Sequence, residues 1–111
     1  MTGTASQIEW AEQIRPRVDA EFHRVAKAFQ TIADRQEDGD RMDTRVIIAI
    51  LEEKRAEVMA KEEAGYFIQV WQELTDQVRK MIAQDPRYQA IQASRKARLS
   101  VRRENADEKI R

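Results

Sequence analysis

The stretch from Asp43 to Gln84 constrains the fold of this chain more than any other segment. It contains no proline and one glycine, Gly65, so no residue in it must interrupt an α-helix. A stripe with steps of three and four runs through it over about five heptads and is apolar except at Glu53 and Glu57, which is the spacing of a coiled-coil seam. We therefore predict one continuous helix over residues 43–84. At about 1.5 Å per residue it would be roughly 60 Å long and would extend beyond a compact domain.

Charge interrupts the seam of this predicted helix. The seam is apolar at residues 46–51 and again at residues 66–82, but the fourteen residues between, 52–65, carry eight charges. Burying Glu53 or Glu57 without a partner would cost about several kcal/mol. These carboxylates must therefore face water or meet basic groups of another helix. We expect the first apolar zone to pack against Phe29 and Ile32, and the second to offer a contact surface.

A preceding helix is predicted over residues 7–37. Its apolar residues recur every three or four positions from Ala11 to Ile32, which indicates one apolar face. Ser6 and Glu9 have the spacing of a capping box at the helix start. Pro16 removes one backbone hydrogen bond, so we expect either a kink near residue 16 or two shorter helices.

A short connection follows and makes the two predicted helices antiparallel neighbours. Gly39 is expected to end the first helix in a left-handed conformation. Asp40 or Asp43 is expected to cap the next helix. The result is a long antiparallel hairpin in an all-α fold.

A third helix is predicted over residues 86–105, with Asp85 as its N-cap and Pro86 as its first residue. From Pro86 onward the chain carries eight basic and three acidic residues, whereas the first 85 residues carry twelve basic and seventeen acidic. We expect a disordered N-terminus at residues 1–5, a single domain over residues 6–93, and a basic helical arm with a frayed tail at residues 94–111. The basic residues of this arm are Arg95, Lys96, Arg98, Arg102 and Arg103.

The residue content argues against enzymatic chemistry. The absence of cysteine excludes disulfides and thiolate chemistry. The glycines are too far apart for a phosphate-binding loop, and no serine lies in a nucleophile motif. We predict no catalytic residue and no cofactor. The N-terminus lacks a secretory signal pattern and no apolar run has the length of a membrane span, so we expect a soluble cytoplasmic protein without membrane contact.

Carboxylates raise one metal-binding alternative. Glutamates crowd the middle of the long predicted helix and could bind a hard cation at a subunit interface, giving a carboxylate metal-binding bundle. The same spacing suits a solvated face with basic partners one turn away, and we predict no metal site. His23 with Asp19 supplies at most two ligands. The glutamates concerned are Glu52, Glu53, Glu57, Glu62 and Glu63.

The predicted function rests only on the sequence features that indicate what kind of partner the chain binds. Charged residues make up 36% of the chain, well above the usual quarter, which suits extended helices better than a compact shell. We predict a non-enzymatic oligomeric interaction or assembly module, with a homodimer favoured and another protein as a further partner. Its proposed contact residues lie in the second apolar zone: Tyr66, Phe67, Trp71, Leu74 and Val78.

The basic arm leaves three readings open, one of which is a helix face that is only solvated by water. It could follow the phosphates of a nucleic acid, making the chain a small nucleic-acid-binding protein. It could instead pair with the acidic middle of the long helix, in the same chain or in a neighbour. The net charge of zero gives no general attraction to either partner.

Overall fold

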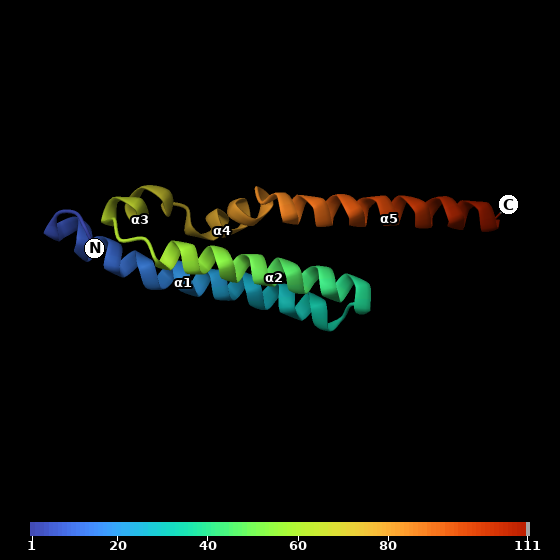
Figure 1. Ribbon diagram of the computed structural model, residues 1–111, viewed down its shortest axis with the longest axis horizontal. Helices are drawn as coiled ribbons and strands as arrows, with labels where there is room; N and C mark the ends of the chain where they lie inside the picture. The colour runs from blue at the N-terminus through green and yellow to red at the C-terminus, as the bar shows by residue number, and fades with distance from the viewer. Residues whose placement is uncertain (111) are drawn as a thin grey trace.

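The computed structural model describes the backbone of residues 1–110 and the side chains of residues 1–101. This part of the chain forms helices and no β-strand, so the all-α fold class is confirmed. In Figure 1, α1 and α2 form the predicted antiparallel hairpin, and α3, α4 and α5 follow one another back along it. The elements are α1 (Ala5–Asp34), α2 (Asp38–Met59), α3 (Ala64–Val70), α4 (Leu74–Ala83) and α5 (Pro86–Ile110).

The prediction of one helix over residues 43–84 is wrong. The chain leaves helical geometry at residues 60–63 and again at residues 71–73. These turns bring Phe67, Trp71 and Val78 into the core, where each is at most 3% exposed. Burying a large apolar side chain contributes about 1.5–3 kcal/mol, whereas helix propensities of ordinary residues differ by less than about 1 kcal/mol. Packing against the hairpin therefore outweighs the local preference for a straight helix.

The N-terminus joins the first of these turns. The Thr2 N–H donates to the Glu62 carbonyl at 2.7 Å, and the Ala64 N–H donates to the Thr2 carbonyl at 2.9 Å. Gly3 has a φ of 138°, a conformation that favours glycine. We call this contact the Thr2 clasp. It supplies hydrogen-bond partners to backbone groups that the interrupted helix would otherwise leave free.

The start of α1 lies earlier than the sequence suggested. Thr4, not Ser6, is the N-cap, and its hydroxyl accepts a hydrogen bond from the Gln7 N–H at 3.2 Å while the Gln7 side chain accepts from the Thr4 N–H at 3.0 Å. The predicted Ser6–Glu9 capping box is therefore wrong. The helix continues through Pro16, so the alternative of two shorter helices is also wrong.

The connection between α1 and α2 differs from the prediction as well. Gly39 lies inside the first turn of α2 and has no left-handed backbone, and Glu37 rather than an aspartate occupies the N-cap position. Arg41, rather than Gly39, supplies the hydrogen bonds at the end of α1. Its guanidinium donates to the carbonyls of Ala33 at 3.1 Å and Gln36 at 2.8 Å, which satisfies carbonyls near the end of α1.

The start of α5 follows the sequence prediction. The Asp85 carboxylate accepts from the Arg87 backbone N–H at 2.8 Å, so Asp85 caps a helix whose first residue is Pro86. Lys54 from α2 lies 3.1 Å from the same carboxylate. These contacts lower the pKa of Asp85, with the Arg87 side chain as the largest cause. Buried Asp85 therefore fixes the α4–α5 corner against α2.

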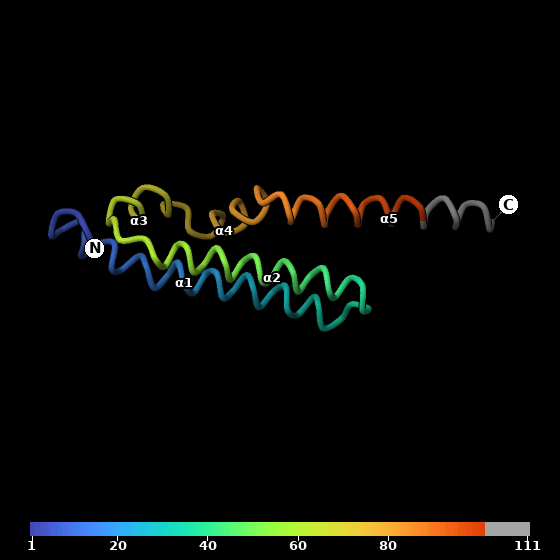
Figure 2. Tube along the Cα trace, in the orientation of Figure 1, coloured from blue at the N-terminus to red at the C-terminus, as the bar shows by residue number. Residues whose placement is uncertain are grey.

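One apolar cluster runs along the hairpin and includes residues of α1, α2, α3 and α4. The radius of gyration is 18.6 Å, compared with about 13 Å for a compact domain of similar length. Figures 1 and 2 show the reason: α5 runs past the turn between α1 and α2. The element that extends beyond the rest is therefore α5, rather than the helix that the sequence suggested.

Candidate interaction surface

The five predicted contact residues lie mostly inside the chain's own core. Phe67, Trp71 and Val78 are buried, and Tyr66 and Leu74 are half-buried. Trp71 packs edge-on against Phe22 of α1, with ring centroids 5.7 Å apart, and Tyr66 packs edge-on against Phe67 at 5.2 Å. In this conformation the three buried residues have no surface left for another chain. Core packing accounts for them.

One stripe of α1 carries two of the large apolar side chains that are exposed in the described part of the chain. The predicted apolar face of this helix included Ile14 and Ile32 but not the other members of the stripe, because arginines and a glutamate interrupt the stripe. Its outer members are Trp10, 57% exposed, and Ile32, 47% exposed. The stripe advances by three or four residues at each step, which keeps it on one side of the helix. Its members are Trp10, Ile14, Arg17, Glu21, Arg24, Ala28 and Ile32; we call it the α1 stripe.

A groove of about 400 Å³ lies at the N-terminal end of the α1 stripe. Trp10, Ile14 and Arg17 form one wall, and the α3–α4 connection around Trp71 and Leu74 forms the other. We call it the Trp10 groove. Trp10 and Trp71, which lie far apart in the sequence, both line this groove.

A second groove, of about 370 Å³, lies at the C-terminal end of the same stripe. Its apolar lining comes from α1, α4 and the first turn of α5, and the two arginines Arg24 and Arg79 also line it. We call it the Tyr88 groove. The apolar lining consists of Val25, Ala28, Phe29, Ile32, Ile82, Ala83 and Tyr88.

Between the two grooves the α1 stripe is polar but internally paired. Glu21 is only 8% exposed, and its carboxylate accepts two hydrogen bonds from the Arg24 guanidinium, one of them from Nε at 2.9 Å. This pairing raises the pKa of Arg24, first through the side-chain hydrogen bond. A nearly buried carboxylate thus has its charge compensated within the chain.

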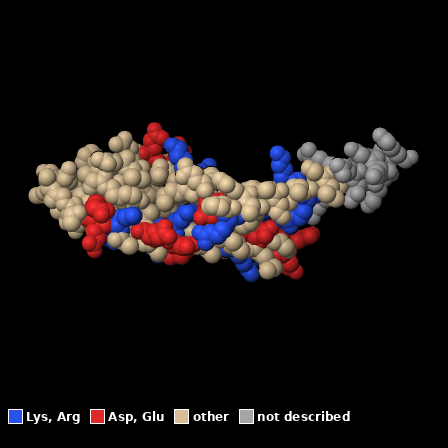
Figure 3. All heavy atoms as spheres, turned by 45° about the horizontal axis from the view of Figure 1, so that its top comes forward, with Lys and Arg blue, Asp and Glu red and all other residues tan. Residues whose placement is uncertain are grey.

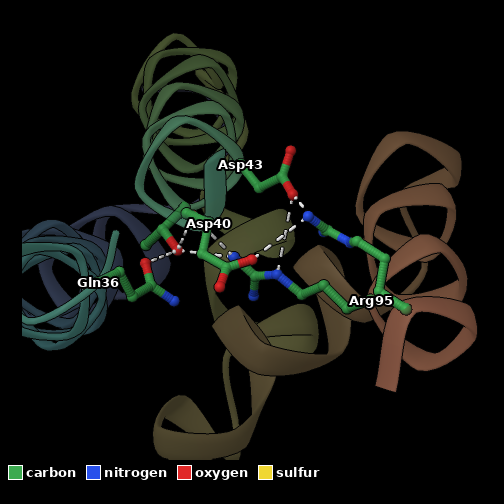
Figure 4. Close-up of polar contacts among 6 residues, drawn as sticks. Gln36, Asp40, Asp43 and Arg95 are labelled. Carbon is green, nitrogen blue, oxygen red and sulfur yellow. Dashed lines mark hydrogen bonds and ion pairs between the residues drawn. The ribbon is translucent and has the colours of Figure 1, made fainter. Parts of the chain in front are cut away.

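The basic arm meets the start of α2. Arg95 donates to the Thr44 hydroxyl at 2.8 Å and to the Asp40 carbonyl at 3.1 Å. Arg98 pairs with Asp43 at 2.8 Å and with Asp40 at 3.4 Å. Figure 4 shows these contacts, in which side chains of α2 and α5 point toward one another beside Gln36.

These contacts show pairing within the chain, but with different acids from those that the sequence suggested. Arg95 and Arg98 meet the aspartates at the beginning of α2, whereas the acidic middle of the predicted helix meets Arg87, through Glu53 at 2.8 Å, as its one ion-pair partner among the described side chains of α5. Glu57 is exposed to water. Two arm cations are therefore already paired, which lowers the number available to nucleic-acid phosphates. Lys96 is exposed, and the side chains of Arg102 and Arg103 lie outside the described residues.

Charge is distributed unevenly over the surface. Residues 64–72 contain no charged side chain, and in Figure 3 the end of the molecule that contains α3 is largely uncharged, while charged side chains gather along the lower side of the molecule. On α2, Arg55 pairs with Glu52 at 2.5 Å and with Asp19 of α1 at 3.0 Å. The Arg55 hydrogen bond lowers the pKa of Glu52.

The carboxylates of the metal-binding alternative do not come together in the described residues. Within residues 1–101, no group of three or more histidine, cysteine, aspartate or glutamate side chains has a metal-binding arrangement. The Asp19–His23 pair lies 3.6 Å apart on the surface of α1. In the described part of the chain, no helix combines the length and apolar character needed to cross a bilayer.

Comparison with known proteins adds no assignment. No family model, curated protein or solved structure matches the chain.

Proposed function

We propose that the chain is a non-enzymatic helical interaction module that self-associates through the α1 stripe. The observation that carries this proposal is the position of Trp10 and Ile32. Both are large, largely exposed apolar side chains, and each lines a groove that opens beside the core. Exposed apolar residues are ordinary when scattered singly, but each of these two lies beside further apolar residues that line its groove, and apolar patches of this kind mark interaction sites.

Physical reasons favour burial of this stripe against another chain. Exposed tryptophan is enriched at binding hot spots, because its ring buries a large area without losing many rotamers. The α1 helix is about 45 Å long at 1.5 Å per residue. With the adjacent α3–α4 row about 10 Å away, the strip between the two axes covers about 450 Å², roughly half of the 800 Å² that each partner buries in a standard interface.

The opposite charges needed at the rim are present on one molecule. Glu9 and Glu12 flank Trp10 in the sequence, and Arg24 and Arg79 line the Tyr88 groove. A second copy offers both signs of charge at once, which supports further copies of the chain as the partner. Rim charges of this kind orient an encounter and add little affinity.

Sedimentation velocity over a range of concentrations tests the proposal. We expect concentration-dependent association for the native sequence, and weaker association for Trp10→Ala and Ile32→Ala. Met42→Ala is the matched control, because Met42 is 67% exposed and lies on α2, away from the stripe. A monomer at every concentration, or an equal effect of all three substitutions, would refute the proposal.

A further inference from the structure

We propose that the chain has a second, arm-exchanged form, in which residues 60–63 become helical and join α2 to α3. In that form the segment α3–α5 packs on the α1–α2 hairpin of a second copy, and the same segment of the second copy packs on the first hairpin. We call this segment, residues 64–110, the arm; it includes the basic arm as its last part. This goes beyond the α1 stripe, because the exchange uses contacts that are buried inside the single chain.

The junction between α2 and α3 carries no sequence signal for a break. Residues 60–63 are Ala, Lys, Glu and Glu, all strong helix formers. The α3 N-cap, Glu63, makes no side-chain capping bond. Among the described residues a left-handed backbone occurs only at Gly3, so the junction needs no glycine. Its local sequence is therefore compatible with both a turn and a helix.

The Thr2 clasp holds the turn in the single chain. It consists of the Thr2 N–H on the Glu62 carbonyl and the Ala64 N–H on the Thr2 carbonyl. In a continuous helix the Ala64 N–H would donate to the Ala60 carbonyl instead, by the i to i−4 pattern. Straightening the junction thus replaces hydrogen bonds rather than abandoning them, which keeps the two forms close in free energy.

The contacts of the arm are available on any copy of the hairpin. Trp71 packs against Phe22, Asp85 pairs with Lys54 at 3.1 Å, and Arg95 donates to the Thr44 hydroxyl. Each of these joins the arm to the hairpin, so a second hairpin offers identical partners. Exchange of an identical element between two copies conserves such contacts and alters only the hinge.

The heptad-like spacing of the sequence supports the straight form. A stripe with steps of three and four runs from Val46 to Met81 across both breaks and is apolar except at Glu53 and Glu57, although the single chain uses it on separate helices. A place where a strong local preference and the observed structure disagree is a candidate for a two-state element. The junction at residues 60–63 is such a place.

Glu63→Pro tests the inference, because it separates the two forms. Glu63 has a φ of −83°, close to the value that proline requires, and its N–H lies outside the Thr2 clasp. The substitution is therefore compatible with the single-chain turn. In a continuous helix the same proline would sit in the interior, so the exchanged dimer should weaken by at least about a hundredfold. Glu63→Ala is the matched control, because it removes the same charge and keeps helix propensity.

The experiment is done in a Trp10→Ala background, which weakens association through the α1 stripe. Each variant is unfolded in urea, refolded at high protein concentration and separated by gel filtration. We expect a slowly dissociating dimer for the background and for Glu63→Ala, and its loss with Glu63→Pro while the monomer keeps its helical circular dichroism. Thr2→Pro removes the clasp donor and should increase the dimer fraction.

Two results would overturn arm exchange. One is the absence of any slowly dissociating dimer in the Trp10→Ala background. The other is a dimer that Glu63→Pro leaves intact. Neither result bears on association through the α1 stripe, which the native Trp10 protein tests separately.

Discussion

Replacing Trp71 with alanine should destabilise the folded chain by about 3–5 kcal/mol. Trp71 is 3% exposed and contacts Phe22 edge-on at 5.7 Å. Truncating a buried tryptophan removes its transfer free energy and leaves a cavity, and together these cost about 3–5 kcal/mol. For a chain of this size, the melting temperature should fall by roughly 12–25 °C.

Urea unfolding followed by far-ultraviolet circular dichroism measures this loss. The series is repeated at several protein concentrations, because self-association would add to the apparent stability. Trp10→Ala is the matched control, since it removes the same side chain from a position that is 57% exposed. It should cost less than about 1 kcal/mol in the monomer.

Trp71→Phe refines the same prediction. The Trp71 indole N–H is buried and has no hydrogen-bond partner among the described residues, and a buried unsatisfied donor costs about 1–3 kcal/mol. Phenylalanine keeps an aromatic ring and removes that donor, so we expect a loss below about 2 kcal/mol. A loss below about 1 kcal/mol for Trp71→Ala, or equal losses for the alanine variants at positions 71 and 10, would refute the core assignment.

Three further predictions follow from particular contacts. Asp85→Asn should lower the unfolding free energy by about 1–2 kcal/mol at neutral pH. Because the Arg87 contact lowers the pKa of Asp85 in the folded chain, the difference in unfolding free energy from the native protein should narrow as the pH falls below about 4, the pKa of an aspartate in the unfolded chain. Urea melts across that pH range would contradict this if the difference stayed constant. Gly3→Ala should cost about 1–2 kcal/mol, since φ is 138° there and alanine avoids that region, and an unchanged melting temperature would contradict it. Arg95→Ala should raise amide hydrogen exchange in the first half of α5, since it removes the donor to the Thr44 hydroxyl, and unchanged exchange there would show that this contact does not hold the helix.

Local signals predicted the helix boundaries where side chain and backbone act within a few residues. Asp85 and Pro86 marked the start of α5 because a cap and a first-turn proline work through adjacent groups. The prediction that Gly39 ends α1 was wrong, because the Arg41 side chain of α2 donates to carbonyls near the end of α1 and replaces a glycine cap. A long side chain arriving from the next helix leaves no short-range pattern in the sequence.

The candidate surface shows the same difference between what short-range sequence patterns predict and what tertiary contacts decide. The sequence identified Tyr66, Phe67 and Trp71 as an important apolar group, but exposure depends on what packs over a residue, and only the fold shows that Phe67 and Trp71 are covered. Trp10 and Ile32 remain exposed for the converse reason, because neither α3 nor α4 covers the α1 stripe fully.

By itself the sequence determined that this chain is helical, that an amphipathic hairpin begins it, and that a basic helix starts at Pro86. Those properties follow from periodicity, propensity and adjacent capping groups, which act over a few residues. The tertiary structure alone decided that the stretch from residue 43 to residue 84 is divided among α2, α3 and α4. The physical reason is that burial of Phe67, Trp71 and Val78 requires contacts with α1, and the Thr2 clasp joins groups about sixty residues apart in the chain.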